Sequence, residues 1–254
     1  QEVWLENGTI QAKLNGPMNP FKDPELGETL QADLSIVPQA GGRVVMLRIG
    51  DEELSLSAGQ WSDWVPVEFE MMPWVADLHG MVRFYLRSVT PHLELYVSPI
   101  NFDPLQPDTQ LSTPADFASQ LAEVTGRFYT QGMPEDTKAL EEGILSREEF
   151  FQQAAISAQD VLAQLDLSVE DFLAESHSFL FYYLGHLDQI SHMTWKSTDP
   201  QHPTYDPETD PYWAGKIEEL YVDIDTLVGE LAQRLEGKAQ LIVMSDHGFA
   251  PWRR

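Results

Sequence analysis

The sequence has no cysteine among its 254 residues. Disulfide bonds and metal sites with thiolate ligands are therefore excluded. The absence of cysteine leaves the redox compartment of the protein undetermined.

Basic residues are also scarce. There are 15 lysines and arginines against 41 aspartates and glutamates, which gives a formal net charge of −26. Nucleic-acid polymers and anionic membranes are poor partners for such a chain, because both repel an acidic surface. A small phosphate substrate remains compatible with this charge, since bound cations can reverse the field inside a pocket.

Long apolar runs are missing as well. No stretch approaches the roughly 18 residues that a membrane-spanning helix needs, and no signal peptide is present. The sequence begins with Gln1 rather than Met, and we expect it to be an internal piece of a longer protein. Localisation signals could then lie outside it, so the compartment stays undetermined. The hydrophobic content of 43% is typical of a globular protein with a real core.

Residues 1–112 are rich in short apolar runs, several of which alternate with polar residues, as in residues 65–70. Gly41-Gly42 is a typical turn signal between two such runs. This pattern predicts an antiparallel sheet or barrel-like subdomain. Its expected strands are residues 3–5, 9–14, 30–37, 43–49, 65–71, 81–89 and 93–98.

The pattern becomes helical after a proline-rich linker at residues 99–114. Residues 146–149 have the spacing of a capping box and predict a helix to about residue 165, followed by a short helix at 168–175. Two apolar runs, residues 179–184 and 241–245, read as buried strands, and a helical stripe at 217–235 lies between them. This order predicts a βαβ unit with parallel strands. We therefore expect an α/β fold, with a β-rich insertion or cap subdomain at 1–112 and an α/β, metal-binding part of the catalytic domain at 113–254.

Acidic residues at 135–136 and 141–142 have a simple interpretation. We expect them on the exposed side of a helix start, where the helix dipole favours negative charge.

Four metal-type ligands follow the two predicted strands. Asp188 and His192 are four residues apart, one helical turn, and follow the first strand. Asp246 and His247 directly follow the second strand. Parallel strands end at one edge of a sheet, so all four side chains are expected to converge there. Imidazole and carboxylate groups are ligands of Zn²⁺, Mn²⁺ and Fe²⁺. Either pair alone would fit a helix cap or a turn, but together they predict metal binding.

These segments resemble those of a known family. The run LIVMSDHGF at 241–249, together with LDQISHMTW at 187–195 and DPQHP at 199–203, resembles the type I phosphodiesterase/nucleotide pyrophosphatase family of the alkaline phosphatase superfamily. More loosely, residues 59–69 and 126–140 resemble the intervening region of bacterial members. The resemblance implies that the α/β part belongs to a parallel-sheet, alkaline-phosphatase-like core.

The resemblance also implies a site and a reaction. Asp188 and His192 match ligands of one metal ion, and Asp246 and His247 match ligands of a second. The family's metals are usually zinc, with manganese or iron as alternatives, and they act on a small-molecule phosphate ester. The nucleophile is a Thr or Ser that forms a covalent phospho-enzyme intermediate.

The sequence also departs from the family pattern. The segment with the nucleophile and a further Asp ligand has no match here, nor has the family's last His ligand. We therefore expect this piece alone to be inactive. Two alternatives stay open: another chemistry of the superfamily (phosphomonoester, phosphonate or sulfate hydrolysis, or a phosphomutase reaction), and a non-catalytic binding module.

Overall fold

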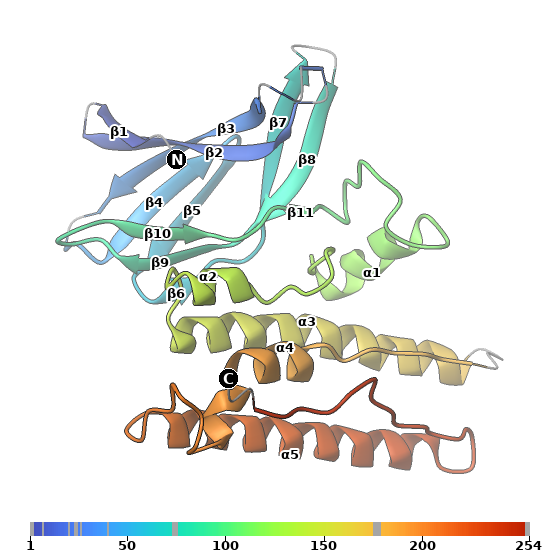
Figure 1. Cartoon of the computed structure of the whole chain (residues 1–254). Helices are drawn as coiled ribbons and strands as arrows, with labels where there is room; N and C mark the ends of the chain where they lie inside the picture. The colour runs from blue at the N-terminus through green and yellow to red at the C-terminus, as the bar shows by residue number, and fades with distance from the viewer. Residues whose placement is uncertain are drawn as a thin grey trace. The chain divides into compact units, whose positions relative to one another are not determined.

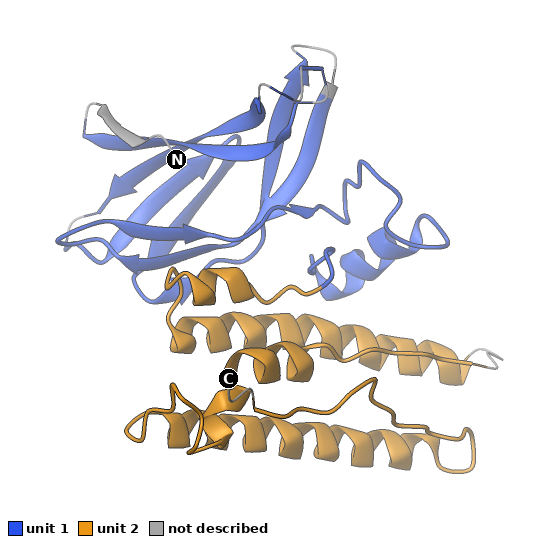
Figure 2. Ribbon diagram, in the orientation of Figure 1, with its two compact units in different colours: residues 1–132 blue, residues 133–254 orange. Residues whose placement is uncertain are grey.

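The chain forms two compact units, residues 1–132 and 133–254, which Figure 2 shows in different colours. The computed structural model describes residues 3–6, 8–19, 21–22, 25, 27–39, 41–72, 76–174 and 179–251. Strands dominate the first unit and helices the second, so the chain is a mixed α/β protein (Figure 1). The role of residues 1–112 as an insertion or cap stays a prediction.

Unit 1 consists of antiparallel sheets, as the alternating sequence predicts. The largest sheet has its strands in sequence order: β1 (Val3–Glu6), β2 (Thr9–Met18), β3 (Thr29–Pro38), β4 (Val44–Ile49) and β5 (Glu52–Ser57). In a second sheet, β9 (Phe84–Ser88) lies between β6 (Gln60–Trp61) and β10 (Glu94–Val97). In a third, β8 (Ala76–Val82) lies between β7 (Val65–Met72) and β11 (Asn101–Phe102).

The core of unit 1 follows from the two-residue period of its strands. On β3, Leu30, Ala32, Leu34 and Ile36 are all buried, while the residues between them are more exposed. Phe69 is fully buried in the same core. Its ring passes over Gly16, where a Cβ atom would lie only 2.5 Å from the ring, so this contact requires glycine.

The predicted strand at 81–89 is two strands in the structure. β8 pairs with β7, and β9 pairs with β6 and β10, so the chain changes sheets at Arg83. The Arg83 guanidinium is buried, donates to the carbonyl of Ser62 at 2.9 Å and lies over the ring of Trp64. The strand ladder is interrupted at Arg83 because its buried guanidinium needs these partners. The apolar residues on both sides of Arg83 nevertheless continue the strand pattern. β5 was also not predicted, because its sequence is largely polar.

Helix α1 (Phe117–Thr125) belongs to unit 1, and the helices that follow it belong to unit 2. They are α2 (Thr137–Glu141), α3 (Arg147–Ala174), α4 (His186–Thr194), the 3-10 helix η2 (Trp195–Thr198) and α5 (Asp210–Leu235). Phe150 and Ala154 of α3 pack against Ile190 of α4, and Leu220 of α5 joins this cluster. The cluster fixes the helix that carries half of the predicted metal ligands.

The capping box that opens α3 is confirmed. The backbone N–H of Ser146 donates to Glu149 Oε2 at 2.7 Å, and the N–H of Glu149 donates to Ser146 Oγ at 3.3 Å. The prediction of a separate helix after residue 165 is wrong, since α3 continues without a break to Ala174. Ser168 fits inside the helix because its hydroxyl donates to the carbonyl of Gln164 at 2.7 Å.

The two predicted buried strands, 179–184 and 241–245, are neither buried nor assigned as strands. Phe179 is 78% exposed and Met244 is also 78% exposed. A strand needs neighbouring strands for its backbone hydrogen bonds, and among the described residues no strand pairs with either segment. The described sheets are all antiparallel, so the parallel core of the predicted fold stays a prediction.

The described helices include none with the length and apolar character needed to cross a membrane.

Candidate metal centre

Helix α4 presents Asp188 and His192 on one face. Gly185 precedes the helix, Asp188 lies in its first turn, and His192 lies in its last turn. Both positions suit the helix dipole, which favours an acid near the N-terminus and a basic side chain near the C-terminus. The spacing of four residues brings Asp188 Oδ1 to 3.3 Å from His192 Nε2.

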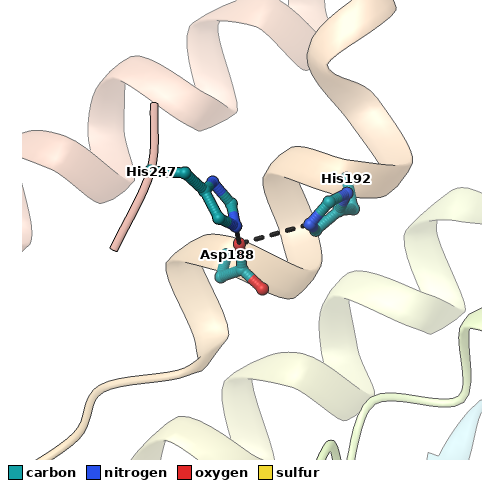
Figure 3. Close-up of side chains that lie close together, drawn as sticks. All are labelled: Asp188, His192 and His247. Carbon is teal, nitrogen blue, oxygen red and sulfur yellow. Dashed lines mark ion pairs between the residues drawn. The ribbon is translucent and has the colours of Figure 1, made fainter. Parts of the chain in front are cut away.

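His247 approaches the same oxygen from a segment 59 residues further along the chain, as Figure 3 shows. Its Nε2 atom lies 3.4 Å from Asp188 Oδ1. One ligand atom from each of Asp188, His192 and His247 lies within 4.8 Å of the others. Three of the four predicted ligands therefore meet at one point: the two on α4 and one that follows the last apolar run.

The backbone sets the tautomer of His247. Its Nδ1 atom lies 3.2 Å from the carbonyl oxygen of Gly248, which can only accept a hydrogen bond. Nδ1 therefore carries a proton, and Nε2 is the ring nitrogen that faces Asp188 and would be available to a metal ion. A backbone partner on the other ring nitrogen is typical of metal-binding histidines.

The two oxygens of Asp188 differ in a way that suits a cation. Oδ2 accepts a hydrogen bond from Gln189 Nε2 at 3.2 Å. Oδ1 is buried, and among the described residues no donor makes a hydrogen bond with it. A buried carboxylate oxygen without a partner is costly. A metal ion between Oδ1 and the two imidazoles would satisfy it, so these residues fit a divalent cation such as zinc.

An aromatic wall borders the three ligands. The Phe249 ring centroid lies 5.0 Å from that of His192, 5.3 Å from that of His247 and 5.2 Å from that of Trp195. Sequence reasoning assigned no role to Phe249 beyond its place in the motif. An apolar wall beside metal ligands restricts their rings and keeps water away from them.

Asp246 lies outside this group of three. Its Oδ1 accepts a hydrogen bond from the backbone N–H of His247 at 3.0 Å, and its side chain is 75% exposed. Its role as a ligand of a second metal ion stays a prediction. His186 is the buried first residue of α4.

The expectation that Glu135 is exposed is wrong. Glu135 is only 3% exposed, and burial raises the pKa of its carboxyl group. Nothing in the sequence distinguishes it from its neighbour Asp136, which caps α2 by accepting a hydrogen bond from the N–H of Ala139.

Comparison with known proteins gives one family. The family model of type I phosphodiesterase/nucleotide pyrophosphatase matches residues 84–254, which include α4 and the segment with His247. No curated protein and no solved structure matches the chain.

The family consists of phosphodiester hydrolases that are generally metal-dependent, in agreement with the ligand types gathered at Asp188. The match covers about two thirds of the sequence and includes every predicted ligand. The chain therefore belongs to the type I phosphodiesterase/nucleotide pyrophosphatase family.

Proposed function

We propose that this chain carries part of the metal centre of a two-metal hydrolase that cleaves small-molecule phosphate diesters or nucleotide pyrophosphates. The convergence of His192 and His247 on one buried oxygen of Asp188, which accepts no hydrogen bond from the described residues, carries the proposal. Family membership supports hydrolysis of a phosphodiester as the reaction class.

Asp188, His192 and His247 would hold one ion, for which zinc is our first choice and manganese or iron the alternatives. Asp246 would bind the second ion. The bound metals would supply charge stabilisation to the phosphoryl group and its leaving oxygen. The chain's own residues would orient them: Gln189 fixes the Asp188 carboxylate, and Gly248 fixes the His247 ring.

The covalent step belongs to the proposal too. A Thr or Ser supplied by a segment outside these 254 residues would act as the nucleophile and carry the phospho-enzyme intermediate. In the full-length protein, the apolar segments 179–184 and 241–245, which are largely exposed in this chain, would be strands of the parallel core, and residues 1–112 would form an insertion or cap.

The experiment compares hydrolysis of bis(p-nitrophenyl) phosphate and p-nitrophenyl phosphate by the full-length protein with zinc. We expect faster cleavage of the diester. Because metal ligands supply several kcal/mol of transition-state stabilisation, the Asp246→Ala/His247→Ala variant should lose at least about 1000-fold in kcat/KM.

The control variant is His202→Ala, which removes an imidazole from a loop where its Nδ1 atom accepts a hydrogen bond from the N–H of Thr204 at 3.2 Å. It should keep wild-type rates. Faster cleavage of the monoester would instead favour a phosphomonoesterase. Equal activity of the wild type and the double variant would contradict the site.

A further inference from the structure

Glu135 is a buried acid with no hydrogen-bond partner for its carboxylate among the described residues. Both of its oxygens are buried, and neither accepts a hydrogen bond of standard geometry. The Ser157 hydroxyl lies beside the carboxylate and partly offsets the rise in its pKa. A carboxylate in this position loses its hydration without full compensation.

The loop around Glu135 is held firmly. Gln153 of α3 is fully buried, and its Oε1 accepts a hydrogen bond from the N–H of Asp136 at 2.9 Å. Its Nε2 donates to the carbonyl of Pro134 at 3.3 Å. These two bonds bracket Glu135 and direct its side chain inward, so its burial is built into the loop.

Contacts along α3 show which part of the segment before and within α4 lies at the level of Glu135. The Tyr182 hydroxyl donates to the carbonyl of Val161 at 2.7 Å, while Ile190 packs against Ala154. The chain from residue 182 to residue 190 thus runs along α3 from Val161 towards Ala154. Ser157, next to Glu135, lies between these two points. The first turn of α4, with Asp188, therefore lies at the level of Glu135.

Electrostatic effects agree with this placement. The charge of Asp188 is one of the causes that raise the pKa of Glu135. Partial loss of hydration raises the pKa of the largely exposed Tyr183, and the charges of Asp188, Asp246 and Glu135 raise it further. Asp188, Asp246 and Glu135 all act on the Tyr183 phenol, so the three carboxylates lie in one region of unit 2.

We infer that Glu135 is a further carboxylate of the metal centre, which faces the cation bound by Asp188, His192 and His247 and strengthens its binding. This inference rests on the proposed function. A cation would compensate two buried carboxylates at once: the unpartnered Oδ1 of Asp188 and the unpartnered pair of oxygens of Glu135. Glu135 could reach the ion directly or through one bound water.

The test is a zinc titration of the 254-residue chain by isothermal calorimetry, with the zinc-induced shift in Tm as a second readout. The Glu135→Gln variant keeps the shape of the side chain and removes its charge. We expect it to bind zinc about 10- to 100-fold more weakly, as for other groups that support metal ligands, with a smaller Tm shift. Glu135→Met should weaken zinc binding in the same way. It replaces Glu135→Gln in the test if the buried amide prevents folding.

The matched control is Glu141→Gln, which removes the same charge from an exposed position on α2. It should bind zinc within about twofold of the wild type. If Glu135→Gln and Glu135→Met bind zinc as tightly as the wild type while Asp188→Asn loses binding, the inference is wrong and the metal site stands. If the wild type itself binds no zinc, both the inference and the proposed metal centre fail.

Discussion

His79 of unit 1 lies between two carboxylates. Its Nδ1 atom is 3.0 Å from Asp108 Oδ1, and its Nε2 atom is 3.7 Å from Glu68 Oε1. The hydrogen bond with Asp108 is the main cause of a raised pKa of His79; burial acts in the opposite direction, and the charges of Asp108, Glu68 and Asp77 add to the rise. The protonated imidazole therefore ties β8 to the loop that carries Asp108.

This contact predicts a pH dependence of stability. Because the folded-state pKa is raised above the ordinary value near 6.5, the stabilisation is complete below that value and is lost as pH rises through the folded pKa. Urea unfolding followed by tryptophan fluorescence between about pH 5.5 and 8.5 measures the effect. Asp108→Asn should weaken this dependence, whereas His92→Gln, at an exposed position, should keep it. An unchanged dependence in Asp108→Asn would exclude the contact as its source.

At the residue scale, the sequence indicated the candidate ligands that share a spacing. Asp188 and His192 are four residues apart, and His247 lies close after an apolar run. These two features were enough to predict that the three side chains converge. Glu135 was not predictable in this way. Its burial depends on Gln153, 18 residues away, and an acid before a helix has the same sequence signature whether it points outward or inward.

At the scale of elements, Asp210 joins three helices of unit 2. It is the first residue of α5 and fully buried. Its Oδ1 accepts hydrogen bonds from Arg147 Nη1 of α3 and Ser197 Oγ of η2, both at 2.7 Å, and its Oδ2 accepts from the N–H of Asp206 at 2.7 Å. Burial alone would raise the pKa of Asp210, but these bonds outweigh it and lower the pKa to about 2.

A lowered pKa gives the opposite dependence on pH. The stabilisation by Asp210 is present above the ordinary carboxyl pKa near 4 and is lost as pH falls towards about 2. At pH 7 it is on the order of 2 kcal/mol. We expect Asp210→Asn to lower the free energy of unfolding by roughly this amount at pH 7 in urea titrations, and the difference from the wild type to shrink at about pH 2.5.

The exposed acid Asp225, also on α5, provides the control. Asp225→Asn should leave stability at pH 7 within about 0.5 kcal/mol of the wild type. A constant difference between wild type and Asp210→Asn at both pH values would mean that the carboxylate charge is not the source of the stabilisation.

Element boundaries were predictable where the signal is local. The capping box at Ser146–Glu149 and the two-residue alternation of β3 and β7 depend on neighbouring residues, and the structure has both. The change of sheets at Arg83 and the unpaired state of residues 241–245 depend on partners far along the chain. An apolar run marks a segment suited to a buried strand, but its burial is decided by the elements beside it.

At the scale of the whole molecule, two segments expose large apolar side chains. Phe179, Phe181 and Tyr183 are 62–78% exposed, and Ile242, Val243 and Met244 are 64–78% exposed. Side chains of this size rarely gather on the surface of a soluble monomer. The net charge of −26 has the opposite effect on association, because it makes copies of the chain repel one another.

We therefore expect the chain to bind the dye 8-anilinonaphthalene-1-sulfonate in its folded state. The double variant Ile242→Ser/Met244→Ser should bind clearly less dye with an unchanged far-UV circular dichroism spectrum. Val222→Ser removes an exposed apolar side chain of α5 and should change dye binding little. Dye binding by the wild type that equals that of the double variant would mean that the segment 241–245 is covered.

The convergence of Asp188, His192 and His247 is the central claim, and anomalous X-ray scattering at the zinc edge from zinc-loaded crystals tests it most directly. We expect a strong peak about 2.0–2.2 Å from Asp188 Oδ1 and from the Nε2 atoms of His192 and His247. A zinc ion bound elsewhere, with these three side chains free of metal at saturating zinc, would contradict it.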